Sequence, residues 1–402
     1  MSVETITFGC RLNIVESEAM LAAAQAAGER DLVIVNTCGV TSESVRQGAQ
    51  AIRRVKRERP EARVAVTGCA VEIEPERFAT MAQIDAIVPN ARKTQASAWA
   101  VRPGAMSSSA RVPTASTHTR AFVDVQNGCD HRCTFCVIPM GRGASRSRPA
   151  EAVVEAVSER VEAGCREVVL TGVDLTSWGG DLPDAPRLGA LVRTILREVP
   201  TLPRLRLSSL DCGEIDADLW EAFGAEPRLM PHLHLSLQSG ADLILKRMKR
   251  RHSRRQSIET CRRARALRPE AAIGADLIVG FPTESEDTFQ ETLALVEDCG
   301  LDFLHVFPYS SRPQTPAARM PQVPAQIVKD RAARLRDCGE AALARRLSRQ
   351  VGGIVRVLAE KGGRGHAEDY ACVRLPQGMA PGEIADVFVR ACEGRELIAE
   401  AL

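Results

Sequence analysis

The sequence predicts an α/β protein with a small doubly wound parallel sheet at the amino terminus, a partial (β/α)6 barrel in the middle and a small antiparallel β-barrel at the carboxyl end. Short apolar, β-branched runs alternate with helical stretches up to about residue 350, which predicts parallel sheets with crossover helices. From residue 351 short alternating strands are separated by glycine turns, a pattern typical of a small β-barrel. A chain of 402 residues is long enough for two or three domains.

The composition narrows the classes of protein that this chain can belong to. Hydrophobic residues make up 45% of the chain, which is ample for buried cores, and no apolar run approaches the length of a membrane span. The net charge of +2 means that any contact with nucleic acid must come from local basic patches. Aromatic residues, at 4%, offer few platforms for stacking bases. Thirteen cysteines in a chain without a signal-peptide pattern indicate a reducing, cytoplasmic location.

The amino-terminal part, residues 1–101, alternates predicted strands with predicted helices. We expect strands at residues 6–8, 32–35, 63–66 and 84–88, and helices near residues 16–27, 42–56 and 75–81. This order predicts a doubly wound parallel sheet, in which the loops beyond the carboxyl ends of the strands converge on one crevice.

Three cysteines distant in the sequence follow the ends of the first three predicted strands. They are Cys10, Cys38 and Cys69, and two of them come directly after glycine. Most free cysteines are small buried residues, and that is the alternative here. Their shared position past the strand ends favours a second reading, in which the three thiols meet in space and hold a metal cluster.

The central part follows a segment rich in Pro, Gly, Ser and Thr, residues 102–119, which is predicted to be a linker. Residues 120–350 then contain six predicted strands, at 122–126, 167–171, 204–208, 232–237, 273–279 and 303–307. Helices are expected at residues 150–163, 188–199, 253–267 and 285–299, and a long one near 326–350. Six strands with intervening helices predict an incomplete parallel barrel, whose chemistry belongs at the carboxyl ends of the strands.

A second group of cysteines lies on the loop after the first of these strands. Cys129, Cys133 and Cys136 form a C-x3-C-x2-C pattern. A structural zinc site normally needs four Cys or His ligands, and His131 lies inside the loop, where it cannot easily join the same tetrahedron. A disulfide is disfavoured because three cysteines cannot pair evenly. An iron–sulfur cluster fits best, since three thiolates on a cubane leave one iron open for a substrate.

A basic run marks the middle of the predicted barrel. Residues 246–255 contain seven Lys or Arg in ten positions. Such a run is often a solvated face. Arg142, Arg146 and Arg148 beside the cysteine loop suggest the alternative of a phosphate-binding rim, with four arginines of the run as the candidate RNA contacts: Arg250, Arg251, Arg254 and Arg255.

The last part, residues 351–402, shows strands at 353–360, 371–375, 383–390 and 396–400. Their alternation and the glycine turns between them predict a small antiparallel barrel. This segment resembles the TRAM domain, an RNA-binding module attached to tRNA-modifying enzymes.

The cysteine segments resemble a known family. C-x3-C-x2-C followed by Val-Ile-Pro resembles the radical S-adenosylmethionine (SAM) enzymes, and the string VQNGCDHRCTFCVIPMGRGASRSRP resembles their methylthiotransferase branch. TFGCRLNIVESE, VNTCGVT and TGCAVE are similar to the amino-terminal domain of the same branch. The resemblance implies two 4Fe-4S clusters, one bound by Cys10, Cys38 and Cys69 and the other, which binds SAM, by Cys129, Cys133 and Cys136.

The same resemblance assigns a role to polar residues and glycines at the ends of the predicted barrel strands, where a bound SAM would lie. These candidate SAM contacts are Thr171, Gly172, Ser208, Ser236, Gln238, Val279 and Gly280. Taken one at a time they are weak signals, because glycine and serine end many strands as ordinary turns.

The implied function is a transferase that adds a methylthio group to an adenine of tRNA. TFGCRLNIVESE, VQNGCDHRCTFCVIP and FPYSSRPQTPAARM are most similar to the members that act on C2 of N6-threonylcarbamoyladenosine next to the anticodon. Alternatives are isopentenyladenosine in tRNA, an aspartate of a ribosomal protein, and a non-enzymatic iron–sulfur RNA-binding protein. The expected partners are tRNA, an electron donor such as flavodoxin or ferredoxin, and a sulfur source.

Overall fold

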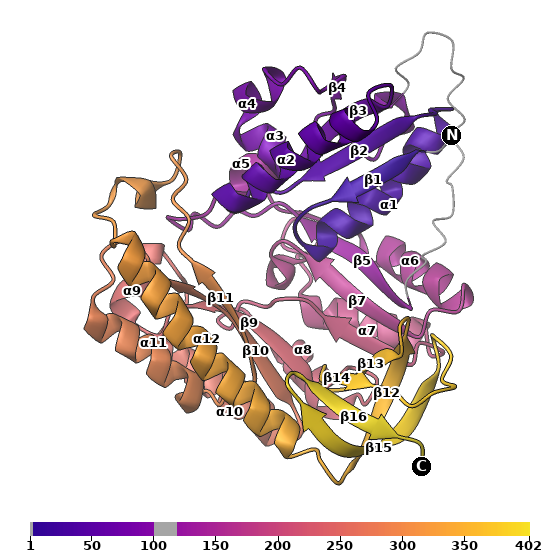
Figure 1. The fold of residues 1–402 in the computed structure, drawn as a ribbon. Helices are drawn as coiled ribbons and strands as arrows, with labels where there is room; N and C mark the ends of the chain where they lie inside the picture. Colours follow the sequence, from indigo (N-terminus) through magenta and orange to yellow (C-terminus); the bar gives the residue numbers. More distant parts are fainter. Residues whose placement is uncertain (1–2, 100–118) are drawn as a thin grey trace. The chain divides into compact units, whose positions relative to one another are not determined.

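The computed structural model describes residues 3–99 and 119–402, which form two compact units (Figure 1). The first unit contains the described residues of the amino-terminal part together with residues 127–146 and 310–318. The second contains residues 119–126, 147–309 and 319–402. The predicted linker, residues 102–119, lies outside the described residues except for Thr119.

The first unit is built on a parallel sheet whose strands follow their order in the chain. The strands are β1 (Glu4–Thr7), β2 (Leu32–Thr37), β3 (Arg63–Gly68) and β4 (Ala86–Ile87). The helices are α1 (Arg11–Ala26), α2 (Ser42–Glu58), α3 (Cys69–Ile73), α4 (Pro75–Ala79) and α5 (Ile138–Arg142). Helix α2 begins where the Thr41 hydroxyl accepts a hydrogen bond from the Ser44 amide at 3.1 Å.

Alternate residues of the central strands enter two different cores, one on each face of this sheet. Val33 and Val35 pack with Val45 and Ile52 of α2, whereas Ile34 packs with residues of α1. Because successive side chains of a strand point to opposite faces, this division shows that both faces are covered. The predicted doubly wound sheet is confirmed.

The second unit contains two sheets, ordered β6-β5-β7-β8 and β11-β10-β9. Six of these strands pair in parallel, β5 with β7 and β7 with β8 in the first sheet and β9 with β10 and β10 with β11 in the second, and the short strand β6 lies at the edge of the first sheet. A parallel bridge between Leu210 and Leu235 connects the two sheets. The strands are β5 (Arg120–Asn127), β6 (Arg146–Ser147), β7 (Glu167–Gly172), β8 (Arg204–Leu207), β9 (His232–Gln238), β10 (Ala272–Val279) and β11 (Phe303–Pro308). The predicted partial barrel is confirmed.

Helices pack against these sheets and bury the apolar side chains of the strands. They are α6 (Ala150–Glu162), α7 (Leu188–Glu198), α8 (Ala217–Ala225), α9 (Asp242–Met248), α10 (Arg254–Leu267), α11 (Glu286–Asp298) and α12 (Ala325–Ser348). Leu205, Leu235 and Leu277 belong to the main core. Their polar neighbours in the strands, such as Arg206 and Asp276, are outside that core, so the other face of the sheets is polar. Among the described helices, none combines the length and apolar character needed to cross a membrane.

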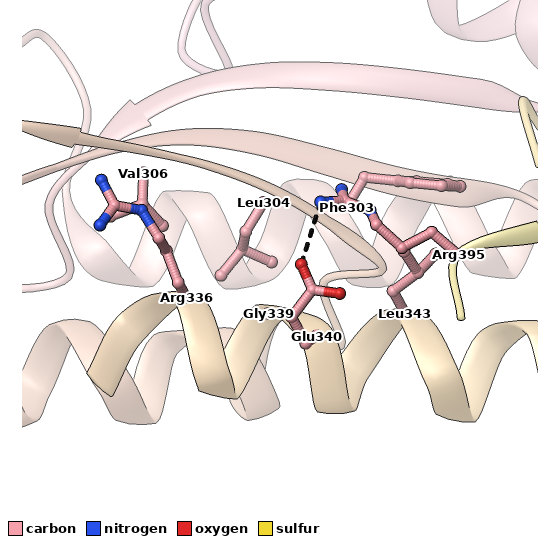
Figure 2. A pocket seen from close by; sticks show the side chains of 8 residues that line it. All are labelled: Phe303, Leu304, Val306, Arg336, Gly339, Glu340, Leu343 and Arg395. Atoms are coloured by element: carbon pink, nitrogen blue, oxygen red, sulfur yellow. Dashed lines mark hydrogen bonds and ion pairs between the residues drawn. The ribbon is translucent and has the colours of Figure 1, made fainter. Parts of the chain in front are cut away.

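Helix α12 lies along β11, and a small pocket of about 150 Å³ opens between them (Figure 2). Gly339 permits the close approach, because a Cβ there would lie 3.1 Å from Leu304 Cβ. Arg395 spans the pocket in Figure 2 to reach Glu340, with Nη1 3.0 Å from Oε1. A cavity of this size is smaller than the 300 to 1,000 Å³ that is roughly typical of cofactor sites, and none of the predicted site residues lines it.

The carboxyl-terminal strands form a closed barrel in the order β12-β13-β14-β16-β15, drawn in yellow in Figure 1. They are β12 (Ile354–Glu360), β13 (Arg364–Ala367), β14 (Cys372–Arg374), β15 (Ile384–Glu393) and β16 (Glu396–Glu400). The pairs are antiparallel except β14 with β16, which is parallel, so the predicted antiparallel barrel is correct except at this pair. Leu343 and Leu347 of α12 complete its core.

Candidate metal centres and cofactor site

Glycines with positive φ set the backbone of the amino-terminal cysteine loops. Gly9 and Gly68, both with φ +102°, directly precede Cys10 and Cys69. Cys10 is the residue that begins α1, and Cys69 is the first residue of α3, a helix that the sequence analysis missed. Cys38 follows the end of β2. All three predicted cysteines therefore lie at the carboxyl edge of the same parallel sheet.

Close backbone approaches bring these loops together. A Cβ on Gly9 would lie 3.0 Å from the Cys38 sulfur, and a Cβ on Gly39 would lie 3.1 Å from the carbonyl carbon of Cys69. A side chain at Gly9 or Gly39 would therefore collide with the neighbouring loop. The structure thus brings together Cys10, Cys38 and Cys69, as the strand-end positions predict.

The pKa values of the thiols depend on one another, as expected for neighbouring groups. Burial raises the pKa of Cys38, and the neighbouring Cys10 thiol raises it further. Burial also raises the pKa of Cys69, while the charges of Arg142 and Lys93 oppose that rise. Within the described residues, the three sulfurs are not among the ligand groups whose atoms all lie within 4.8 Å of one another. A single tetrahedral zinc ion would bring its thiolates to about 3.8 Å from each other, so the wider triad suits a cluster better.

A group of buried charges lies next to this triad. Arg142 Nη1 is 2.8 Å from Glu16 Oε1, and Lys93 Nζ is 2.5 Å from Glu16 Oε2. Arg142 also donates to Asn13 Oδ1, and at 2.9 Å to Asn127 Oδ1. The suggestion that Arg142 forms part of a phosphate-binding rim is therefore wrong, because its guanidinium is buried in an internal ion pair.

Sequence reasoning missed Glu16 and Lys93. The available signal was the spacing of Asn13 and Glu16, which lie three residues apart at the start of α1 and so share one face of that helix. Two polar side chains on the buried face of an otherwise apolar helix indicate an internal polar partner.

The second cysteine loop is a tight turn closed at its base. Gly128 has φ +76°, and a Cβ there would lie 1.9 Å from the Ala144 carbonyl oxygen. The Cys129 amide donates to the Gly143 carbonyl at 3.1 Å, and the Cys136 sulfur accepts from the Ile138 amide at 3.4 Å. The three sulfurs are only partly buried. Cys129, Cys133 and Cys136 thus lie on one short, partly exposed loop, as a cluster that leaves one iron open to a substrate requires.

Helix α5, which follows this loop, packs against the helix that begins at Cys69. Val137 shares an apolar contact group with Cys69 and Ile73. The Gly141 carbonyl accepts a hydrogen bond from Asn90 at 2.6 Å, and a Cβ on Gly141 would lie 3.1 Å from Cys69 Cβ. For this reason residues 127–146 belong to the compact unit of the amino-terminal sheet, although they follow the predicted linker in sequence.

The predicted SAM contacts lie at the carboxyl ends of neighbouring strands in the second unit. Thr171 and Gly172 end β7, Ser208 follows β8, and Ser236 and Gln238 lie at the end of β9. Val279 ends β10, and Gly280 follows it. Ser208 is buried, and its hydroxyl has no hydrogen-bond partner among residues 3–99 and 119–402. A buried hydroxyl without a partner at a strand end is suited to accept or donate to a ligand. The individual SAM contacts stay predictions.

Gln126 holds the loop after β7. Its Oε1 accepts from the Val173 and Asp174 amides at 3.0 and 2.9 Å. A Cβ on Gly172 would lie 3.0 Å from the same oxygen, so this strand end tolerates only glycine without a shift. The sequence analysis did not single out Gln126, because one glutamine in a strand carries no distinctive pattern.

The four arginines of the basic run differ in their surroundings. Arg250 is buried, with Nη2 2.6 Å from Asp211 Oδ2 and 2.8 Å from the Ser236 carbonyl. Arg254 donates to the Gly240 and Glu291 carbonyls at 3.0 and 2.6 Å. Arg251 and Arg255 are exposed, at 54% and 83% of the side chain, beside Glu214 and Glu259. The RNA-binding role of these arginines stays a prediction. The exposed Arg251 and Arg255 are better placed for it than Arg250 and Arg254.

Comparisons with known proteins identify relatives of this chain. Residues 123–296 match the model of the Radical SAM superfamily, and residues 2–89 match Uncharacterized protein family UPF0004. A threonylcarbamoyladenosine tRNA methylthiotransferase of Rickettsia prowazekii is 44% identical over 95% of this chain and 93% of its own. A tRNA-2-methylthio-N(6)-dimethylallyladenosine synthase of Cereibacter sphaeroides is 34% identical over 98% of this chain and 97% of its own.

Solved structures show the same fold at low sequence identity. The radical SAM methyltransferase TsrM of Kitasatospora setae, whose structure contains a 4Fe-4S cluster, superposes with a TM-score of 0.52 over 76% of this chain and 70% of its own. The two sequences are 16% identical, so this likeness concerns the fold alone.

Proposed function

Because this chain belongs to the radical SAM tRNA methylthiotransferases, we propose that it transfers a methylthio group to C2 of N6-threonylcarbamoyladenosine beside the tRNA anticodon. The observation that supports this substrate is the 44% identity to a relative named for it, against 34% and 36% to relatives named for dimethylallyladenosine. The segment Phe307 to Met320 of this chain is similar to the threonylcarbamoyl members as well.

The cofactors of this family are SAM and two 4Fe-4S clusters, and both cysteine triads fit such clusters. Each triad offers only thiolates, which are the ligands that iron–sulfur clusters prefer, and each leaves a fourth iron without a protein ligand. We assign Cys10, Cys38 and Cys69 to one cluster, and Cys129, Cys133 and Cys136 to the one that binds SAM. The bound groups supply the one-electron cleavage of SAM and the sulfur that is transferred.

The side chains of the protein bind and orient the cofactor and the substrate. The proton on C2 of an adenine is not acidic, so no side chain is required as a general base there. Gln126 fixes the loop after β7, and the Ser208 hydroxyl, which has no partner within the described residues, offers a hydrogen bond at the next strand end. The target base must leave its stack to reach such a site, which costs little in an unpaired anticodon loop. The proposed electron donor is flavodoxin or ferredoxin, and the cytoplasm, where tRNA is found, is the proposed location.

Mass spectrometry of tRNA nucleosides from a deletion strain tests the substrate. We expect the methylthio form of threonylcarbamoyladenosine to disappear and the unthiolated nucleoside to accumulate. Loss of methylthio-isopentenyladenosine instead would assign the chain to the alternative tRNA substrate. Unchanged tRNA together with an unmodified ribosomal-protein aspartate would assign it to the ribosomal protein.

Two cysteine variants test the division between the triads. Cys38→Ala should bind about half the iron, still cleave SAM to 5′-deoxyadenosine when reduced, and form no methylthio product. Cys133→Ala should keep the amino-terminal cluster and lose SAM cleavage. Iron content, 5′-deoxyadenosine and methylthio-nucleoside are measured side by side for both. Product from Cys38→Ala, or SAM cleavage by Cys133→Ala, would contradict the assignment.

A further inference from the structure

A buried group of charged side chains beside the amino-terminal triad holds more positive than negative charge. Lys93, Arg142 and Glu16 expose only 2%, 3% and 9% of their side chains. The Glu16 carboxylate lies between both cations, with contacts of 2.5 Å to Lys93 and 2.8 Å to Arg142. Among the residues that the structure describes, the other side chains that accept hydrogen bonds from Arg142 are those of Asn13 and Asn127, and both are neutral. Two buried cations therefore share one carboxylate.

A surplus charge in the interior needs a counter-charge, because desolvating an ion without one is costly. The nearest candidates are the cysteines of the triad. Asn13 Oδ1, which accepts from Arg142, also accepts from the Cys10 thiol at 3.7 Å, and a Cβ on Gly141, the residue before Arg142, would lie 3.1 Å from Cys69 Cβ. At this proximity the charge of Arg142 acts on both thiols, and the charge of Lys93 acts on Cys69. Neutral thiols cannot supply the missing negative charge. Thiolates that ligate a cluster can.

The charges match when the cluster is included. Three thiolates outweigh the positive charge of an oxidised cubane core by a single negative charge. The surplus of Lys93 and Arg142 over Glu16 is a single positive charge. The two sites neutralise each other, and the more reduced cluster, which carries one further electron, is stabilised by the same cations.

We propose that Arg142 and Lys93 are positioning residues that compensate the charge of the amino-terminal cluster and raise its reduction potential, with Glu16 holding both cations in place. This inference rests on the ligand assignment of the proposed function. It also connects the two triads, since Arg142 lies six residues after Cys136 in sequence, on the helix that follows the other cysteine loop. The loop of one cluster thereby supplies the counter-charge of the other.

The test uses the full chain with Cys129, Cys133 and Cys136 replaced by Ala, so that only the amino-terminal cluster is reconstituted. Its midpoint potential is measured by a redox titration followed by electron paramagnetic resonance. Arg142→Gln removes a positive charge and should shift the reduction equilibrium at least tenfold towards the oxidised cluster, about 59 mV for one electron. Glu16→Gln removes the negative charge and should shift the potential in the opposite direction. Arg142→Lys keeps the charge, so its midpoint potential should stay near that of the parent.

Arg146→Gln is the matched control, because it removes the same charge from an exposed position four residues away. Its shift should be much smaller. If the Arg142→Gln protein does not retain a cluster, Glu16→Gln still tests the inference, because its midpoint potential should rise. Shifts of the same sign in the two variants, or shifts no larger than that of Arg146→Gln, overturn the inference alone. A parent without a cluster, or one that keeps it after Cys38→Ala, overturns the ligand assignment and the inference with it.

Discussion

Gly68 places Cys69 by adopting a left-handed backbone conformation with φ +102°. In Gly68→Ala the new Cβ would lie 2.3 Å from the Thr37 carbonyl oxygen, so β2 or β3 must shift in addition to the backbone strain. We expect a loss of about 3 kcal/mol in the free energy of unfolding and loss of the amino-terminal cluster, measured by urea denaturation and iron content.

Gly28→Ala is the control for this substitution. Gly28 also has positive φ, at +76°, but a Cβ there would meet no atom within 4 Å. The backbone strain alone should cost about 1 kcal/mol and leave the iron content unchanged. Equal effects of the two substitutions would show that the close approach at Gly68 is unimportant.

Asp211 makes part of the stability dependent on pH. Burial by itself raises the pKa of Asp211, but the His252 ring, with Nδ1 3.6 Å from Asp211 Oδ1, and the charge of Arg250 outweigh it and lower the pKa to about 2. A carboxyl group with a depressed folded pKa stabilises the protein above its unfolded pKa, and that contribution disappears as the pH falls from about 4 towards 2.

We therefore expect Asp211→Asn to lose about 2 kcal/mol at neutral pH and to lose less further stability than the parent between about pH 4 and pH 2. Urea unfolding of the cluster-free protein at a series of pH values measures both effects. Asp184→Asn, at an exposed position, serves as the control. Parallel pH profiles of parent and Asp211→Asn would exclude this role of Asp211.

At the scale of elements, the carboxyl-terminal barrel is bound to the strands of the second unit through buried arginines. Arg206 is 3.0 Å from the buried Glu167 and donates at 3.1 Å to the Glu368 carbonyl. Arg204 donates at 2.8 Å to the Arg356 carbonyl. Leu343 and Leu347 of α12 form part of the core of the barrel. The barrel is therefore a structural part of this unit in addition to any role with RNA.

A chain that ends at residue 350 should consequently be unstable. Truncation exposes Leu343 and Leu347 and leaves two buried arginines without carbonyl partners, which costs several kcal/mol in sum. We expect aggregation, measured by size-exclusion chromatography, or a large drop in melting temperature, measured by thermal unfolding. Lys361→Ala, at an exposed position of the barrel, should change neither. A truncated chain that melts like the parent would show that the barrel is an independent attachment.

At the scale of the whole molecule, a net charge of +2 gives no strong attraction to tRNA, so binding depends on local cations. Arg251→Ala with Arg255→Ala should weaken tRNA binding and reduce the salt dependence, because each lost phosphate contact removes about 0.7 to 0.9 from the logarithmic slope. Arg250→Ala should instead lower stability, since it leaves Asp211 buried without its ion pair. Affinity for tRNA measured over a range of salt concentrations distinguishes the two. An unchanged slope in the double variant would mean that this stretch is only a solvated face.

The sequence by itself determined most of the strands, the long helices and the positions of the six cysteines at strand ends and on one loop, while their role as cluster ligands stays a prediction. Strands such as β7 and β10 were predictable because alternating or continuous apolar runs are local patterns, and Cys10, Cys38 and Cys69 were predictable because parallel strands end at one edge. The short elements α3, α5, α8, α9, β6 and β13 were missed, since segments of two to nine residues contain too little periodicity to detect.

Only the tertiary structure decided which arginines are internal. Arg142 and Arg250 stand in the sequence among exposed cations of the same kind, and no local pattern separates them from Arg146 or Arg255. Their partners Glu16 and Asp211 lie 126 and 39 residues away. A guanidinium becomes buried only where the fold brings a carboxylate to it and the ion pair offsets the loss of water, and that pairing exists only once distant strands and helices have packed.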